Sequence, residues 1–465
     1  MSLLLPICVA GALVAPGRPT APTAAPALGC RPATPVSQSA TPAGRTAQPL
    51  SILDAIQRAL SHNLAVLTAA QGARRADGGR WSALADLLPS VAGRVSDSRQ
   101  TINLAAFGFP LPPGTPSLVG PFSVFDARVA VSQPILDLRA LGAVQAQQHM
   151  LAAARFNEQS ARDLVVLATA NLYLRTLAAE ARAASAAAQA DTARAVVSVA
   201  TSMKASGMVA GIDVLRAEVQ QASADQRAAA AANDVSKLKL QLAQVTGLDA
   251  ARPLVLSDVL PSVPTATLDV GEALTQAYRS RPDYLAAQER VKAAEADRRA
   301  AVGELLPSVR VTADYGAIGH TPGDAQTTYA VAGSVAVPIF TGRTRGHLIT
   351  ADADLAARRA ELEDLRQTID TDVRSALLDL DSTRQQLEVA SRGRTLADEQ
   401  LTHARDRFAA GVAGSLEVVQ AQEAVAAATE HHITALYGYT VAKALLARTL
   451  GVAEESARQL LGGTR

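Results

Sequence analysis

The stretch LLPSV at residues 87–91 returns without a gap at residues 305–309, 218 positions further along the chain. A second pair of segments, IDVL at 212–215 and LEVV at 416–419, is related by a shift of 204. A duplication of this kind indicates two copies of one supersecondary unit. The two shifts differ because the first copy carries a longer insert, which contains the loop-like run AAFGFPLPPGTPSLVGPF at 105–122.

Each copy has the same predicted order of elements: helix, strand, loop, strand, very long helix, glycine turn and helix. We therefore divide the chain into a signal-like segment with a Pro/Ala/Thr-rich linker at 1–49, a first repeat at 50–255 and a second repeat at 256–465. The fold class expected from this order is mainly α with a small β part.

Two segments of the second copy alternate with the period of a β-strand. Residues 308–315 and 329–337 alternate apolar with small or polar side chains, and about ten residues of such alternation is typical of a membrane-crossing barrel strand. The matching strands of the first copy are expected at about 91–101 and 126–136. Proline disfavours helix in the residue before it. The four helix–strand junctions are marked by Pro89, Pro134, Pro307 and Pro338.

Two very long helices are predicted at 137–205 and 342–409. At about 1.5 Å per residue, each would be roughly 100 Å long, which does not fit a compact domain. The second helix has a heptad pattern that resumes after one eleven-residue step, which is typical of a coiled coil with a stutter. The apolar positions are Leu348, Leu355, Leu362, Ile369, Leu380, Leu387, Leu401 and Phe408.

The composition argues against several classes of protein. The net charge is only +1 with acids and bases interspersed, whereas a nucleic-acid-binding protein normally has a basic face. Charged residues make up 19% and aromatic residues 3%, which favours packed helices over a globular core rich in large side chains. Metal-ligand spacings, phosphate-binding loops and acid–base clusters are lacking, so we expect no metal, no cofactor and no enzyme activity.

The N-terminal segment resembles an export signal. Residues 2–15 form an apolar run that suits the core of a secretory signal and is too short to span a bilayer. The sequence ALGC at 27–30 partly matches a lipoprotein cleavage site. Lipidation of Cys30 is therefore one interpretation, and a simple linker cysteine is the other.

Membrane contact would have to come from strands. After the N-terminal segment, the sequence has no run of eighteen uncharged apolar residues, and open sheet edges do not occur in hydrocarbon. Four strands are too few to close a barrel, for which about eight is the practical minimum. The chains must therefore pool their strands in an oligomer, and three chains would supply twelve strands and a ring of twelve helices.

The motifs LSILDAI at 50–56, RPDY at 281–284 and PIFTG at 338–342, together with both LLPSV segments, resemble the signatures of the TolC-type outer membrane efflux proteins. The resemblance covers about residues 50–452. It implies a homotrimer with a 12-stranded β-barrel in outer-membrane lipid, continuous with an α-helical barrel in the periplasm. It also implies a periplasmic adaptor and an inner-membrane pump as partners, and no catalysis. Drugs, metals and proteins all remain open as exported substrates.

The resemblance implies two kinds of site near the glycine turns. The first is a tip that contacts the adaptor, although a glycine there also serves simply as a helix C-cap. Its residues are Ser206, Gly207, Met208, Ala410, Gly411 and Val412. The second is a tunnel constriction, in which carboxylates favour cations. Its residues are Glu417, Gln420, Asp213, Arg216 and Phe408.

The constriction differs from the pattern of the family. One of the two carboxylates expected after the second turn is kept as Glu417 and the other is an amide, Gln420. Phe408 lacks the hydroxyl that would bond to Asp213. Both acids also suit a helix N-terminus, where they offset the helix dipole, so the structural and the gating interpretations stand side by side.

A soluble, elongated coiled-coil scaffold is the alternative function. It accounts for the long helices but leaves the four strand-length segments next to proline unexplained.

Overall fold

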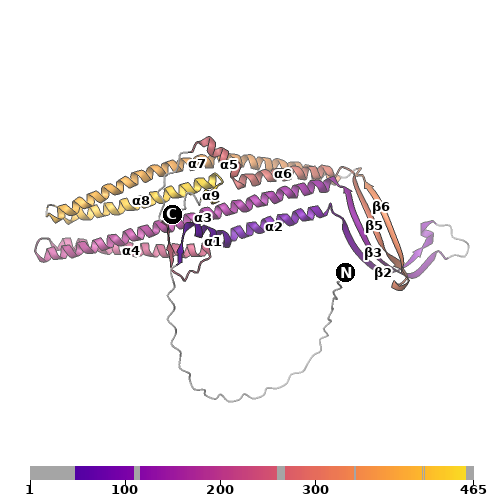
Figure 1. Ribbon diagram of the computed structural model, residues 1–465, viewed down its shortest axis with the longest axis horizontal. Helices are drawn as coiled ribbons and strands as arrows, with labels where there is room; N and C mark the ends of the chain where they lie inside the picture. The colour runs from indigo at the N-terminus through magenta and orange to yellow at the C-terminus, as the bar shows by residue number, and fades with distance from the viewer. Residues whose placement is uncertain are drawn as a thin grey trace, which may run out of the picture. The chain divides into compact units, whose positions relative to one another are not determined.

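The computed structural model describes residues 48–108, 116–258, 268–339, 342–410, 412 and 414–456 (Figure 1). Cys30 and Gly411 lie outside the described residues. The helices are α1 (Ile52–His62), α2 (Leu64–Ala85), α3 (Leu138–Ala205), α4 (Gly211–Thr246), α5 (Val270–Ser280), α6 (Pro282–Gly303), α7 (Gly342–Ala409), α8 (Ser415–Thr449) and α9 (Ala453–Ser456). Short 3₁₀ turns occupy Leu104–Phe107 and Pro322–Asp324.

The two long helices agree closely with their predicted ranges. Helix α3 begins one residue later than expected, and α7 has the predicted bounds. The heptad positions of α7 are buried or half-buried. Ile369 lies in a core with residues of α5 and α6, and Leu401 and Phe408 pack against buried residues of α7 and α8. The heptad pattern therefore identified the face that packs.

The helices form two successive sets that share α3 and α7. At the end next to the sheet, α3 packs against α2 and α6, and α6 packs against α7. Towards the helical turns, α3 packs against α4 and α8, and α8 packs against α7 (Figure 1). The slot between α3 and α7 is thus filled first by α6 and then by α8. In both sets α7 is an outer helix, opposite α2 or α4.

The strands form an antiparallel four-stranded sheet in the order β2-β3-β5-β6. Its strands are β2 (Ser90–Asn103), β3 (Leu118–Leu136), β5 (Ser308–Gly319) and β6 (Gln326–Ala336). Among the described strands, β2 and β6 each pair with one neighbour only. The sheet therefore has two open edges.

The first-copy strands differ from the prediction. Strand β3 begins at Leu118 instead of near residue 126, because its first residues pair with β2 beyond a register shift between Gln100 and Ile102. Pro134 lies inside β3 rather than at a junction, next to the register shift that follows it. Proline donates no hydrogen bond and is tolerated where a ladder is irregular. The start of β3 and the position of Pro134 both depend on how the strands pair across the sheet, and the periodicity of the sequence does not reveal this pairing.

The register separates an apolar from a polar face of the sheet. Residues directly opposite one another share a face, so Val95, Ala127, Ala317 and Thr327 lie together, as do Arg94, Arg128, Gly316 and Thr328. The first face also carries Val91, Val129, Val131, Tyr315, Tyr329, Val331 and Val335, whose side chains are exposed. On the second face Arg128 Nε lies 2.7 Å from Asp126 Oδ1, and its Nη1 lies 3.2 Å from Asp314 Oδ1.

A compact core surrounds the middle of α3. The short strands β1 (Gln48–Leu50) and β4 (Leu254–Leu256), which were not predicted, pair in parallel beside it. The hydroxyl oxygen of the buried Tyr173 lies 2.9 Å from Leu50 O and 2.8 Å from Asp258 Oδ2, so its one proton is shared between two acceptors. Because a buried hydroxyl needs a partner, these contacts tie the segment before α1 and the segment after β4 to α3.

Among the described helices, α3 is the one that is long and apolar enough to cross a membrane by length and composition alone. In its most apolar window 56% of the residues are buried inside the structure, as in the core helix of a packed bundle. The length and composition of α3 are therefore weak evidence for a membrane helix.

Candidate functional site

The first tip joins α3 to α4 through a glycine turn. Gly207 adopts φ +73°, a conformation that favours glycine. Its N–H donates to Lys204 O at 3.0 Å, and the N–H of Met208 donates to Met203 O at 2.9 Å. This pattern satisfies carbonyls at the end of α3 as in a Schellman motif. Ser206 Oγ also donates to Ser202 O at 2.8 Å, and the side chain of Met208 remains 67% exposed.

The second tip, between α7 and α8, repeats part of this hydrogen-bond pattern. The N–H of Val412 donates to Arg407 O at 3.0 Å, as Met208 does to Met203. The N–H of Ala410 donates to Asp406 O at 3.0 Å. Val412 is 72% exposed. Both turns thus place one large aliphatic side chain in solvent at the end of a helical hairpin.

Three of the five predicted constriction residues line one groove between the hairpins. Asp213 and Arg216 from α4 and Phe408 from α7 line a groove of about 340 Å³. The other lining residues are Val196, Ala200, Ile212, Leu215, Ala217, Val219, Gln220, Leu416 and Val419. Glu417 and Gln420, on α8, are not among its described lining residues. The structure therefore brings Asp213 and Phe408 together but places Glu417 elsewhere.

The charged residues at the tips form ion pairs within each hairpin. Asp213 Oδ1 lies 3.6 Å from Arg216 Nη1, one turn along α4. Glu417 Oε1 lies 3.0 Å from Arg407 Nη1 across the α7–α8 turn. Arg407 was missed by the sequence analysis, although it and Glu417 are equally far from residue 412. Symmetry about the turn would have suggested the pair.

A second groove, of about 170 Å³, lies beside the first and shares Gln220 with it. Its lining is more polar and includes Gln189, Arg227, Arg405 and Gln422. The side-chain nitrogen of Gln422 is buried and has no hydrogen-bond partner among the described residues. The space between the two hairpins is therefore apolar next to the turns and polar further along the helices.

The comparisons with known proteins agree with this geometry. The profile of the outer membrane efflux protein family matches residues 55–248 and 273–452. Protein CyaE of Bordetella pertussis is 29% identical over 59% of this chain and 58% of its own length. The pyoverdine export outer membrane protein OpmQ of Pseudomonas putida is 25% identical over 96% of both chains. The crystal structure of the CmeC outer membrane channel of Campylobacter jejuni superimposes with a TM-score of 0.75 at 16% identity, covering 88% of this chain and 89% of CmeC.

The chain belongs to the outer membrane efflux protein family. Its fold is the TolC-like fold of the solved outer-membrane channels. This places it in the outer membrane with its helical part in the periplasm, and it favours a channel over the soluble scaffold. The matches cover between 35% and 58% of the first three curated relatives. The adaptor-contact and constriction roles of the tip residues stay predictions.

Proposed function

We propose that the chain is a passive exit duct in the outer membrane, part of a tripartite efflux or type I secretion system. The observation that carries the proposal is the four-stranded sheet with one apolar and one polar face, attached to helices of 68 residues. Such a sheet suits a wall between lipid and an aqueous lumen. Helices of that length extend about 100 Å, enough to continue a tunnel through much of the periplasm.

The open edges of the sheet support a homotrimer, the oligomer that the family resemblance implies. Strand β6 of one copy would pair with β2 of the next, and three copies would close a barrel of twelve strands without leaving an edge in lipid. The tandem repeats, 50–255 and 256–465 after the segment 1–49, would then give the tunnel a pseudo-sixfold wall.

The outer helix α7 supports the same assembly. It carries exposed apolar side chains at Leu378, Val389 and Leu396. Their spacings of eleven and seven residues place them on one stripe of the helix. This stripe suits the α2 or α4 edge of a neighbouring copy, and α4 carries the exposed Leu240.

The partners are proposed to be a periplasmic adaptor at the tips and an inner-membrane pump beyond it. The tips offer exposed Met208 and Val412 next to a groove that is apolar near the turns. An adaptor that presents apolar helical ends would bury these side chains. Glu417 and Asp213 are proposed to line the constriction, with Phe408 packing behind it.

Single-channel conductance of the protein purified from outer membranes tests the proposal. Trimers by light scattering, together with long-lived conductance steps in planar bilayers, are expected. Cysteines placed at Met208 and Val412 should crosslink to an adaptor in cells, whereas a cysteine at the exposed Leu67 of α2 should not. A monomer without conductance would contradict the proposal.

A further inference from the structure

The RPDY motif at 281–284 forms the corner between α5 and α6. Arg281 is the last cap of α5 and the first cap of α6, because Pro282 disfavours helical backbone at the residue before it. The N–H of Arg281 donates to Ala277 O at 2.9 Å, and its carbonyl accepts from the N–H of Leu285 at 3.1 Å. The backbone of Arg281 therefore makes the last hydrogen bond of α5 and the first hydrogen bond of α6.

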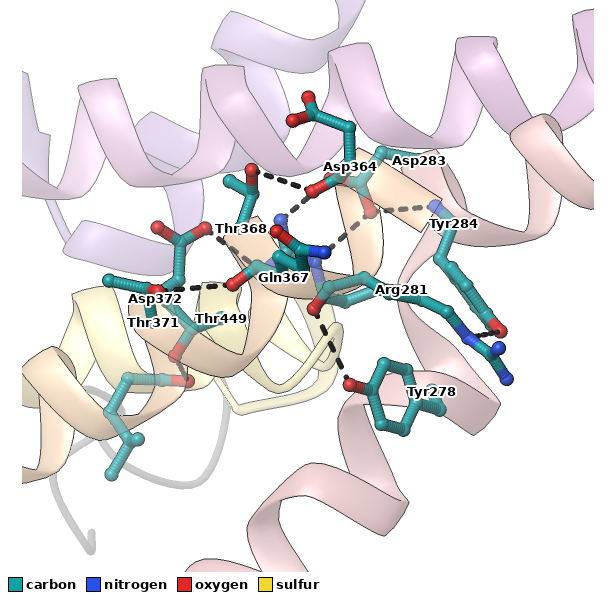
Figure 2. Close-up of polar contacts among 12 residues, drawn as sticks. Tyr278, Arg281, Asp283, Tyr284, Asp364, Gln367, Thr368, Thr371, Asp372 and Thr449 are labelled. Carbon is teal, nitrogen blue, oxygen red and sulfur yellow. Dashed lines mark hydrogen bonds and ion pairs between the residues drawn. The ribbon is translucent and has the colours of Figure 1, made fainter. Parts of the chain in front are cut away.

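The side chain of Arg281 ties this corner to α7. Its Nη2 and Nε lie 2.7 Å and 3.1 Å from the two carboxylate oxygens of Asp283, and its Nη1 lies 3.2 Å from Asp372 Oδ2 on α7 (Figure 2). Arg281 is only 7% exposed. Burial opposes ionisation of Asp283, but the hydrogen bonds from Arg281 outweigh it, so the pKa of Asp283 is lowered. Only a guanidinium presents a fork that can hold one carboxylate with two bonds and still reach a second.

The segment that follows the C-terminal end of α8 packs closely against the same corner. Gly451 has φ +74°, and a Cβ at this position would lie 2.5 Å from Arg281 N. Ser280 Oγ donates to Leu450 O at 2.6 Å. The start of α6, the middle of α7 and the end of α8 therefore meet at Arg281. This is also the level at which α8 replaces α6 in the slot between α3 and α7.

The α7–α8 hairpin has direct polar contacts with α3 near the corner, and grooves lie between the hairpins nearer the tips. Near the corner, Tyr437 Oη donates to Asn171 Oδ1 at 2.6 Å, and Arg182 Nε lies 2.7 Å from Glu430 Oε1. Beyond these contacts the two hairpins are separated by the grooves of about 170 and 340 Å³. The α7–α8 hairpin is therefore fixed near the corner and less constrained at its tip.

We infer that Arg281 is the positioning residue for the α7–α8 hairpin, holding its root so that the tip keeps its place at the constriction. The inference rests on the proposed function, because it takes the tip as the gate of the duct. Asp372 and Arg407 are 35 residues apart on α7, which is roughly 50 Å along the helix. Loss of the root contacts should therefore change gating at a distance from the gate itself.

Single-channel recording of the trimeric protein with Arg281→Gln, Arg281→Lys or Asp372→Asn tests the inference. In Arg281→Gln, transitions between conductance levels should become at least five-fold more frequent. Arg281→Lys should behave like Arg281→Gln, since an ammonium cannot reproduce the fork. Asp372→Asn, which weakens only the bond to α7, should give a smaller increase. Arg279→Gln is the control, because Arg279 is an exposed neighbour on α5.

A purely structural role would lower the thermal stability of these variants and leave their switching frequency unchanged, and this result would overturn the inference. Wild-type switching in Arg281→Lys would overturn the bidentate argument. If Arg281→Gln does not assemble, the switching frequency of Asp372→Asn tests the inference instead, and an unchanged frequency would overturn it. A wild-type protein without channels would overturn the proposed function, whereas channels that are insensitive to Asp372 would overturn this inference alone.

Discussion

At the scale of single residues, the predicted constriction residues Asp213 and Glu417 each have an arginine partner. Glu417 was expected to favour cations at the constriction, yet its Oε1 lies 3.0 Å from Arg407 Nη1. Asp213 has Arg216 one turn away. An exposed pair of this kind adds only about 0–1 kcal/mol to stability. For the proposed constriction the pair matters through its charge, because each arginine offsets the charge of one carboxylate.

The pair leads to opposite predictions for its two members. Arg407→Ala should increase the preference of the channel for K⁺ over Cl⁻, because Glu417 is then left without its neighbouring positive charge. Glu417→Ala should weaken cation preference and block by multivalent cations. Reversal potentials in a KCl gradient measure both effects. Gln420→Ala, one turn along α8, is the uncharged control, and an unchanged preference in both charge variants would contradict the role of the pair.

At the scale of elements, the alternation of the strands has an energetic consequence that neighbouring residues can test. Val331 lies on the apolar face of β6 and Ala332 on the polar face, opposite Ala313 and Thr312. Val331→Arg should cost about 2–4 kcal/mol, the range for a cation on the lipid side of a barrel strand near mid-bilayer. Ala332→Arg should be tolerated. Urea unfolding in lipid vesicles compares the two, and equal losses would contradict the assignment of the faces.

Helix α3 carries a buried carboxylate beside the corner formed by Arg281. Asp163 lines a small cavity with Arg281, Asp283, Asp372 and Arg448. Burial, reinforced by Glu454, raises the pKa of Asp163 to about 6, while Arg448 and Arg162 act in the opposite direction. Between about pH 4 and pH 6 the folded state therefore binds more protons than the unfolded state, and stability falls as the pH rises.

Asp163→Asn removes this penalty. The variant should gain clearly more stability relative to the wild type at pH 7.5 than at pH 4.5, where the carboxyl of the folded wild type is still protonated. A folded-state pKa of about 6, against the ordinary 3.8, corresponds to a stability penalty of roughly 3 kcal/mol at pH 7.5. Thermal unfolding midpoints at the two pH values provide the measurement. Asp234→Asn on the exposed side of α4 is the control, and a difference between Asp163→Asn and wild type that does not change with pH would contradict the prediction.

At the scale of the whole molecule, the apolar stripe of α7 should decide assembly. Val389 is 73% exposed in the single chain and is proposed to be covered by a neighbouring copy. Val389→Glu would bury a carboxylate in an apolar contact, which costs several kcal/mol unless a partner is found. The expected result is a loss of trimers by light scattering. Thr395→Glu introduces the same charge at an exposed position roughly 100° around the helix from this stripe, so trimers should persist; their loss in both variants would argue against a specific stripe.

The sequence by itself determined the long helices, the glycine turns and most of the strand positions, because these depend on local periodicity and backbone chemistry. The heptads of α7 and the alternation in β5 and β6 repeat over a few residues, so they can be recognised in the sequence alone. The bounds of α3 and α7 followed to within one residue. The early start of β3 did not, since its first residues are strand only through pairing with β2.

Only the tertiary structure decided which residues meet. Asp213 and Phe408 come from different repeats and share one groove, whereas Glu417 is paired across its own turn with Arg407. The sequence showed the RPDY motif only as a family resemblance. In the structure Arg281 of this motif contacts Asp372 and Gly451, which are far away in sequence. The physical reason is that helix contacts join residues tens to hundreds of positions apart, and a periodic pattern identifies the face that packs without identifying its partner.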